Sequence, residues 1–163
     1  MKWWHYLLSV LVLVFLGIQF VPNDLPEVEL QNPGDIMLTG MVNDEVAGLL
    51  KNSCYDCHSN ESKYPWYSHI APSSWLVTKD IREGREELNF SQWNSYDLME
   101  QLGKLDDIVE EVSSGNMPMG IYTLMHSSAK LSDAQRELIV AWAEESMDKL
   151  VEEDEADFEE NEN

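Results

Sequence analysis

A five-residue motif, Cys54-Tyr55-Asp56-Cys57-His58, constrains this chain more than any other feature. The order C-x-x-C-H is the pattern by which a c-type haem is attached covalently to a protein. Cysteines at this spacing face the same side of a helical turn, so each thiol can add to one haem vinyl group. His58 lies one turn after Cys54, where its imidazole can bind the iron from the proximal side. The motif therefore predicts one covalent haem c held by Cys54, Cys57 and His58.

Two other chemistries use the same cysteine spacing. A redox disulfide of this type follows a strand, whereas residues 46–51, directly before the motif, have a helical pattern. A zinc site needs a second pair of ligands, and the sequence contains only these 2 cysteines. The surrounding sequence therefore favours haem attachment over both alternatives.

The chain begins with an apolar run. Residues 7–21 contain few polar side chains, and with the aromatic residues in front the run approaches the length that spans a bilayer. Lys2 precedes the run and acids follow it, which favours a cytoplasmic N-terminus and export of the remainder. We predict that residues 1–22 form an uncleaved transmembrane helix. The alternative is a cleaved signal segment. Residues 20–22, at the expected cleavage site, are bulky, whereas such sites contain small residues, so the sequence favours the uncleaved helix.

The remaining sequence indicates one small domain between a tether and an acidic tail. Residues 23–40 are rich in proline and are predicted to be extended, and residues 41–150 have the length of a single domain. Residues 152–163 contain eight acids and no base, so the segment 151–163 is predicted to be disordered. We expect the domain to lie in the periplasm, held at the inner membrane by a single-pass anchor.

The charge of the chain limits its partners. The formal net charge is -21, and without the eight acids of the tail it is still -13. Such an acidic body excludes nucleic acid as a partner. It would attract a redox partner protein with a basic docking patch, although the same charge also serves solubility.

The sequence predicts an all-α fold, because no stretch alternates with the period of a strand for long enough. The first predicted helix follows Asn43 and runs into the motif, and the second covers residues 73–87. The third has leucine and valine side chains at steps of three or four and ends at Gly115. The last begins at Ser132, which opens a capping box.

The segment between the third and last helices offers candidates for the sixth position of the iron: Met117, Met119, Met125 and His126. A thioether stabilises ferrous iron and raises the reduction potential, as in electron-carrying cytochromes. Met117 is preferred because it lies in a turn that Pro118 helps to hold. His126 is the alternative and would give bis-histidine ligation at a lower potential. Each methionine is also a plausible packing residue.

Two further candidates lie between the motif and the second helix. Trp66, with the tyrosines beside it, is predicted to line a flat hydrophobic cofactor, unless these rings form an aromatic core that needs no cofactor. The carbonyl of Pro72 is a candidate acceptor for the Nδ1 proton of His58. Such a hydrogen bond fixes the tautomer and orientation of a ligating histidine.

The chain resembles the small haem-binding domain family of bacterial c-type cytochromes, from about residue 45 to residue 144. The matching pieces, in order, are residues 52–60, 64–67 and 70–72, Trp75, residues 84–85, residues 88–91 with Trp93, the turn at 115–118, Tyr122 with His126, and residues 131–132 before Trp142. The resemblance implies a cytochrome c-like helical domain wrapped round one haem, with Pro72 as carbonyl acceptor and Met117 as distal ligand. The segment 119–130 is longer than in that pattern, which leaves His126 open as a ligand.

These observations favour a membrane-tethered monohaem cytochrome that transfers electrons outside the cytoplasm, an electron carrier rather than a catalyst. A peroxidase-like enzyme would need an open distal site with an acid–base residue, and His126 is the obvious candidate. A haem sensor module with an open or bis-histidine distal site is the third possibility.

Overall fold

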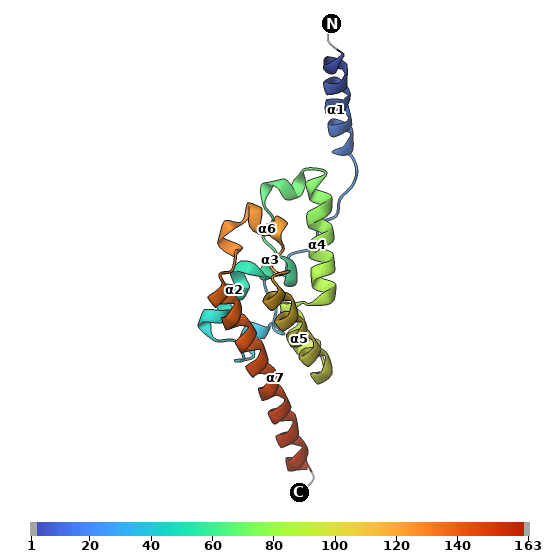
Figure 1. Ribbon diagram of the computed structural model, residues 1–163. Coiled ribbons are helices and arrows are strands. Elements are labelled where there is room, and N and C mark those ends of the chain that lie inside the picture. Colours follow the sequence, from blue (N-terminus) through green and yellow to red (C-terminus); the bar gives the residue numbers. More distant parts are fainter. Residues whose placement is uncertain (1–2, 162–163) are drawn as a thin grey trace.

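The computed structural model describes residues 3–161, which form helices joined by loops, the longest of them between Ile18 and Ile36 (Figure 1). The α-helices are α1 (Trp4–Ile18), α2 (Asp44–Ser53), α3 (Tyr55–His58), α4 (Ser73–Glu87), α5 (Leu98–Ser114), α6 (Gly120–Met125) and α7 (Asp133–Asn161). The 3-10 segments are η1 (Ile36–Leu38), η2 (Trp66–His69), η3 (Phe90–Ser95) and η4 (Ser127–Ala129). No strand occurs in residues 3–161, so the predicted all-α class is confirmed.

Local sequence signals set the ends of the helices that carry the domain. The Asn43 side chain accepts a hydrogen bond from the Val46 N–H at 3.0 Å and caps α2. A capping box of Asp97 and Glu100 begins α5. Gly115 ends α5 in the left-handed conformation, with φ of 82°, which glycine adopts without steric cost.

The hydrophobic core lies mainly between α5 and α7. Leu105 of α5 and Ile139 of α7 are both completely buried. Trp142 of α7 is also buried, and its indole N–H donates to the Met41 carbonyl at 3.0 Å, which joins α7 to the start of the domain. Trp93 of η3 covers the core from another side. α2 packs on α7, and α3 packs on both α2 and α4.

The segment predicted as a tether, residues 23–40, is packed against the domain. Arg82 and Arg85 of α4 donate to the carbonyls of Asp24 at 2.7 Å and Glu27 at 2.9 Å. A turn closed by the Asp35 N–H and the Asn32 carbonyl at 3.1 Å leads into η1, where Ile36 is completely buried in the core. The folded unit therefore includes residues before 41, because arginines of α4 bind the extended backbone.

The first helix is shorter than predicted for residues 1–22. α1 covers 15 residues, and none of the described helices has both the length and the apolar character needed to cross a membrane. The predicted transmembrane helix is therefore not supported; residues 1–2 of it lie outside the described part of the chain. The polar side chain of Gln19, just past the end of α1, pairs with the Ala71 backbone, donating to its carbonyl and accepting from its N–H, both at 3.0 Å.

The prediction of a disordered tail is wrong for residues 151–161, which continue α7 as a helix. Extending an existing helix adds one hydrogen bond per ordered residue, and this segment is rich in Glu and lacks Gly and Pro. The end of α7 projects beyond the rest of the molecule (Figure 1). Residues 162–163 of the predicted tail lie outside the described residues.

Candidate functional site

A cavity of about 670 Å³ lies among α2, α3, α4, α5, α7 and the turn after α5. All three chemically active motif residues line it: Cys54, Cys57 and His58. Its apolar lining consists of Leu50, Leu88, Phe90, Ile108, Val112, Ile139, Met117, Pro118 and Met119. Six carboxylates also line the cavity, so an apolar wall and an acidic group of residues meet there, in a volume typical of cofactor sites.

The motif forms a tight helical turn between α2 and α4. The N–H groups of Cys57 and His58 both donate to the Cys54 carbonyl, at 3.1 and 2.9 Å. This turn brings the two sulfur atoms and the imidazole to one cavity. The two residues between the cysteines anchor it: Tyr55 donates to Asp35 at 2.7 Å, and Asp56 accepts from Tyr122 at 2.8 Å.

A glycine of α4 allows the motif to approach that helix closely. A Cβ atom at Gly84 would lie 3.0 Å from the Cys57 carbonyl oxygen and 3.3 Å from the Cys57 Cβ. The first distance is tighter than nine in ten real Cβ contacts, so a side chain here would require the Cys57 backbone to shift by a few tenths of an ångström. Gly84 therefore sets the position of the motif through its missing side chain.

The backbone near the end of α4 orients His58. Its Nδ1 atom lies 2.8 Å from the Gly84 oxygen and 3.1 Å from the Leu88 oxygen. Two carbonyl acceptors require a proton on Nδ1, which leaves Nε2 as the nitrogen available to a metal. Burial lowers the pKa of His58, opposed in part by these two carbonyls, so the ring is in the neutral form that binds metals.

The predicted role of Pro72 is wrong. Its carbonyl accepts a hydrogen bond from the Trp75 N–H at 3.1 Å, and the Nδ1 partners of His58 are Gly84 and Leu88. Pro72 immediately precedes α4, so its carbonyl is used in the first turn of that helix. The acceptors come instead from the other end of α4, where the Gly84 oxygen also accepts from the N–H of Leu88, the residue that caps the helix, at 2.9 Å.

Both thiols are held in the protonated state. Burial, with the nearby Cys57 charge, raises the pKa of Cys54 to about 12. Burial and the charges of Asp56 and Asp80 likewise raise the pKa of Cys57 to about 12, opposed by Arg85. A neutral thiol suits an apolar wall, whereas a reactive or zinc-binding cysteine needs an environment that stabilises thiolate.

The structure separates the four candidates for the distal position. Met117 and Met119 line the cavity, whereas Met125 is 57% exposed and lies outside the lining. The Met117 backbone is held on both sides, because its N–H donates to the Glu111 carbonyl at 3.0 Å and its own carbonyl accepts from Arg136 at 2.6 Å.

His126 also lies outside the cavity lining. Its ring stacks on Tyr122 with 4.3 Å between the ring centres, and its Nε2 lies 3.3 Å from the Tyr67 hydroxyl. These contacts hold the His126 imidazole in a cluster with the rings of Tyr67 and Tyr122. The structure therefore brings Met117 and Met119, and not His126, to the motif.

The aromatic wall was predicted on the wrong residue. Trp66 is 72% exposed and does not line the cavity, because η2 carries it on the outer surface of the domain. Tyr122 of α6 lines the cavity instead. Burial raises the pKa of Tyr122, with the hydrogen bond to Asp56 adding to the shift, so its hydroxyl remains a donor. The resemblance includes Tyr122 among its matching pieces, but it does not assign this residue a place in the cofactor wall.

The cavity residues fit a haem. Haem presents a flat apolar ring, two vinyl groups, two carboxylates and an iron, and the lining offers apolar walls, two thiols and a neutral imidazole. The Ser53 hydroxyl, buried in the same lining, has no hydrogen-bond partner among the described residues. Leaving such a hydroxyl unpaired costs about 1–3 kcal/mol, which a carboxylate of the bound group would recover.

Comparison with known proteins agrees with this chemistry. The sequence matches the haem-binding domain family over residues 13–145, so the chain belongs to this family, as its motifs predict. It is 28% identical over 107 residues to cytochrome c peroxidase Ccp of Escherichia coli (strain K12), covering 61% of this chain and 22% of that protein. The chain thus spans about a fifth of the length of this curated relative. No solved structure matches.

Proposed function

We propose that this protein is a monohaem c-type cytochrome that transfers single electrons outside the cytoplasm. The observation that carries the proposal is the meeting of Cys54, Cys57 and His58 on one apolar cavity. The bound haem would supply the one-electron couple of its iron. Each thiol would add across a vinyl group, forming a C–S bond while its proton goes to the other vinyl carbon, so attachment needs no oxidant.

The residues of the chain have separate tasks in this function. Cys54 and Cys57 hold the group permanently, and His58 offers Nε2 because Gly84 and Leu88 bind its other nitrogen. The apolar wall excludes water and so limits the rearrangement that accompanies a change of charge. Met117, the preferred distal ligand, would favour ferrous iron and raise the potential.

A peroxidase function is the second candidate, and the similarity to cytochrome c peroxidase favours it. A peroxidase requires an open sixth position with an acid–base group nearby. His126, the sequence candidate for that group, lies outside the lining and stacks on Tyr122. The methionines in the lining and the position of His126 together favour electron transfer.

The proposal extends to partner and location. Six carboxylates line the cavity, on Asp80, Glu83, Glu86, Glu87, Asp107 and Glu111, and its lining contains no Lys or Arg among the described residues. This arrangement supports a redox partner with a basic docking patch.

We place the domain in the periplasm at the inner membrane, with the apolar segment 1–22 holding it there. Protease added outside the inner membrane should then cleave the domain in spheroplasts, and resistance of the domain in intact spheroplasts would contradict this location.

Optical spectra of the ferric and ferrous protein test the assignment. The wild type should be low-spin in both states, because a methionine closes the sixth position. Met117→Ala should give high-spin ferric iron, a lower potential and greater peroxidase activity. Met119→Ala and His126→Ala are the matched controls and should leave the spin state unchanged.

Two results would overturn the proposal. A wild-type protein that is already high-spin and turns over peroxide would establish the peroxidase candidate. A spin-state change in Met119→Ala or His126→Ala, but not in Met117→Ala, would move the distal ligand to that residue.

A further inference from the structure

Acidic residues are distributed very unevenly along this chain. Residues 1–23, 62–79 and 112–132 contain none of the 31 Asp and Glu residues, although these segments include 62 of the 163 residues. An even distribution would place about twelve acids there. The same segments contain Lys2, Lys63, Lys79 and Lys130, so they are positive in a chain whose formal net charge is -21.

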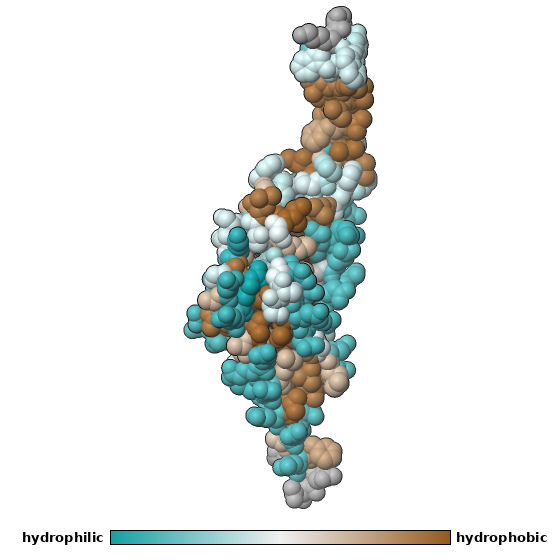
Figure 2. All heavy atoms as spheres, viewed as in Figure 1, coloured by the Kyte–Doolittle hydropathy of each residue, from teal (hydrophilic) through white to brown (hydrophobic). Residues whose placement is uncertain are grey.

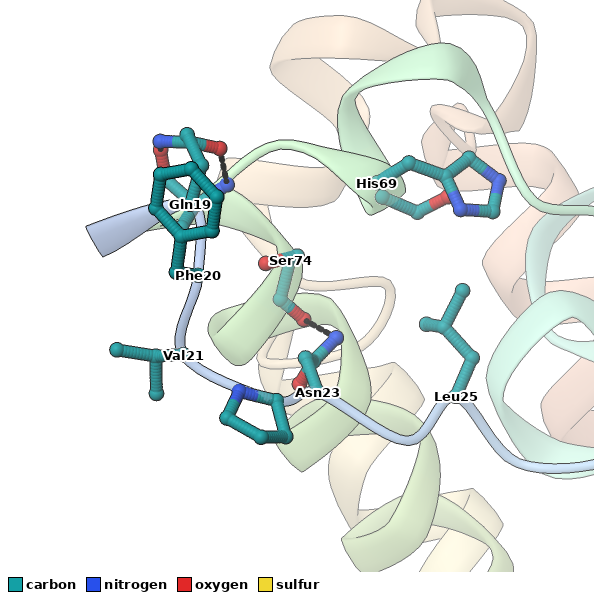
Figure 3. A pocket seen from close by; sticks show the side chains of 10 residues that line it. Gln19, Phe20, Val21, Asn23, Leu25, His69 and Ser74 are labelled. Atoms are coloured by element: carbon teal, nitrogen blue, oxygen red, sulfur yellow. Dashed lines mark hydrogen bonds between the residues drawn. The ribbon is translucent and has the colours of Figure 1, made fainter. Parts of the chain in front are cut away.

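These three segments meet in space. The end of the first, at Gln19, pairs with the Ala71 backbone of the second through two hydrogen bonds of 3.0 Å. Figure 3 shows this junction, where a small cavity of about 290 Å³ lies between residues 19–25 and the segment that includes His69 and Ser74. The second and third segments meet where the Tyr67 hydroxyl lies 3.3 Å from Nε2 of His126. Together, η2, α6 and residues 19–21 form what we call the acid-free pole.

The acid-free pole exposes large apolar side chains. Trp66 of η2 is 72% exposed, and Ile121 and Leu124 of α6 are 56% and 80% exposed. Phe20, next to α1, is 87% exposed. Brown, hydrophobic atoms fill the part of α1 nearest the domain and form a patch on the adjoining end of the domain, whereas strongly hydrophilic atoms are concentrated farther from α1 (Figure 2). The acidic end of α7 lies at the opposite end of the molecule from α1 (Figure 1).

We propose that the acid-free pole is a membrane-binding surface that rests on an anionic lipid bilayer. Aromatic and aliphatic side chains favour the boundary between headgroups and acyl chains. The pole contains no acid, which removes the repulsion from anionic headgroups that the rest of this chain would experience, and the lysines of the three segments, such as Lys63 three residues before η2, are attracted to those headgroups. The orientation places the acidic end of α7 away from the bilayer.

A lipid surface fits this pole better than a protein partner because the pole is continuous with α1. No residue of α1 is buried, and the exposed Phe20 and Val21 connect this apolar helix to the pole. The inference rests on the proposed location at the membrane but not on haem ligation. It concerns the folded domain itself, since Trp66 and Leu124 belong to η2 and α6 and not to the N-terminal segment.

Hydrogen–deuterium exchange of the full-length, haem-loaded protein tests the proposal. The protein is compared in solution and bound to vesicles of phosphatidylethanolamine and phosphatidylglycerol. We expect the amides of η2 and α6 to exchange about tenfold more slowly on vesicles, because the bilayer covers them. Amides of α5 and α7 should exchange at the same rate in both states.

A matched pair of variants provides the control. Leu124→Glu places an acid on the acid-free pole, whereas Met99→Glu makes a similar change at a side chain that is 74% exposed on α5. Leu124→Glu should abolish the protection of η2 and α6, and Met99→Glu should retain it. Unchanged haem spectra in both variants separate this result from a failure of the haem assignment. Exchange of η2 and α6 that is equal in solution and on vesicles would overturn the proposal, as would loss of protection in both variants.

Discussion

Replacement of Gly84 by alanine tests whether the missing side chain positions the motif. The added Cβ would lie 3.0 Å from the Cys57 carbonyl oxygen, which belongs to the backbone of α3 and can yield only if the turn shifts. Such overpacking costs about 1–3 kcal/mol. Alanine regains up to about 1 kcal/mol of helix propensity over glycine. The net expectation is a loss of about 1 kcal/mol in the free energy of unfolding.

Gly103→Ala is the matched control in α5. A Cβ there has no atom within 4 Å, so only the gain in helix propensity remains. It should stabilise the protein by about 0.5–1 kcal/mol. Gly84→Ala should therefore lower the thermal midpoint of unfolding and Gly103→Ala should raise it. The two midpoints should be separated by about 4–8 °C for a chain of this length.

Thermal unfolding of the haem-loaded protein, followed by circular dichroism, measures this difference. Gly84→Ala should also change the visible spectrum, because the Gly84 carbonyl binds Nδ1 of His58 at 2.8 Å. If Gly84→Ala raises the midpoint as much as Gly103→Ala and leaves the spectrum unchanged, the close approach does not position the motif.

Two further predictions concern the segment that carries the distal candidates. Tyr122→Phe removes the hydrogen bond to Asp56 and should accelerate the binding of imidazole to the ferric protein. The control Tyr64→Phe removes a hydroxyl that donates to the Pro26 carbonyl at 2.6 Å and should not change this rate. Equal binding rates in the two variants would exclude a role for Tyr122. Arg136→Leu removes the donor to the carbonyls of Met117 and Val112, and the loss of these charge-assisted hydrogen bonds should destabilise the protein by about 1.5–3 kcal/mol in urea unfolding and increase the high-spin fraction. An unaltered spin state in Arg136→Leu would show that Met117 does not depend on this contact.

The sequence predicted features that depend on neighbouring residues. The helix at 73–87 has the predicted bounds, Asn43 caps α2, and Gly115 ends α5, because capping and termination act within a few positions along the chain. The grouping of Cys54 with His58 also follows from helical spacing alone.

Features that depend on distant contacts were not predicted. The hydrogen-bond acceptor of His58 Nδ1 depends on the close approach of α3 to α4 at Gly84, and no pattern in the neighbouring sequence predicts that contact. Trp66 has the composition of a cofactor wall, but η2 exposes it while α6 supplies Tyr122 from later in the chain. The acidic segment after residue 151 has the composition of a disordered tail, yet it extends a helix that tertiary packing already holds.

The central claim is that Cys54 and Cys57 hold one haem covalently in the cavity. Its most direct test is the intact mass of the protein, made with a c-haem maturation system, denatured and extracted with acidified organic solvent. We expect a chain heavier by the mass of one haem, and an unmodified chain for the double variant Cys54→Ala, Cys57→Ala. A wild-type chain that loses all haem to the solvent, or a double variant that keeps the added mass, would contradict the claim.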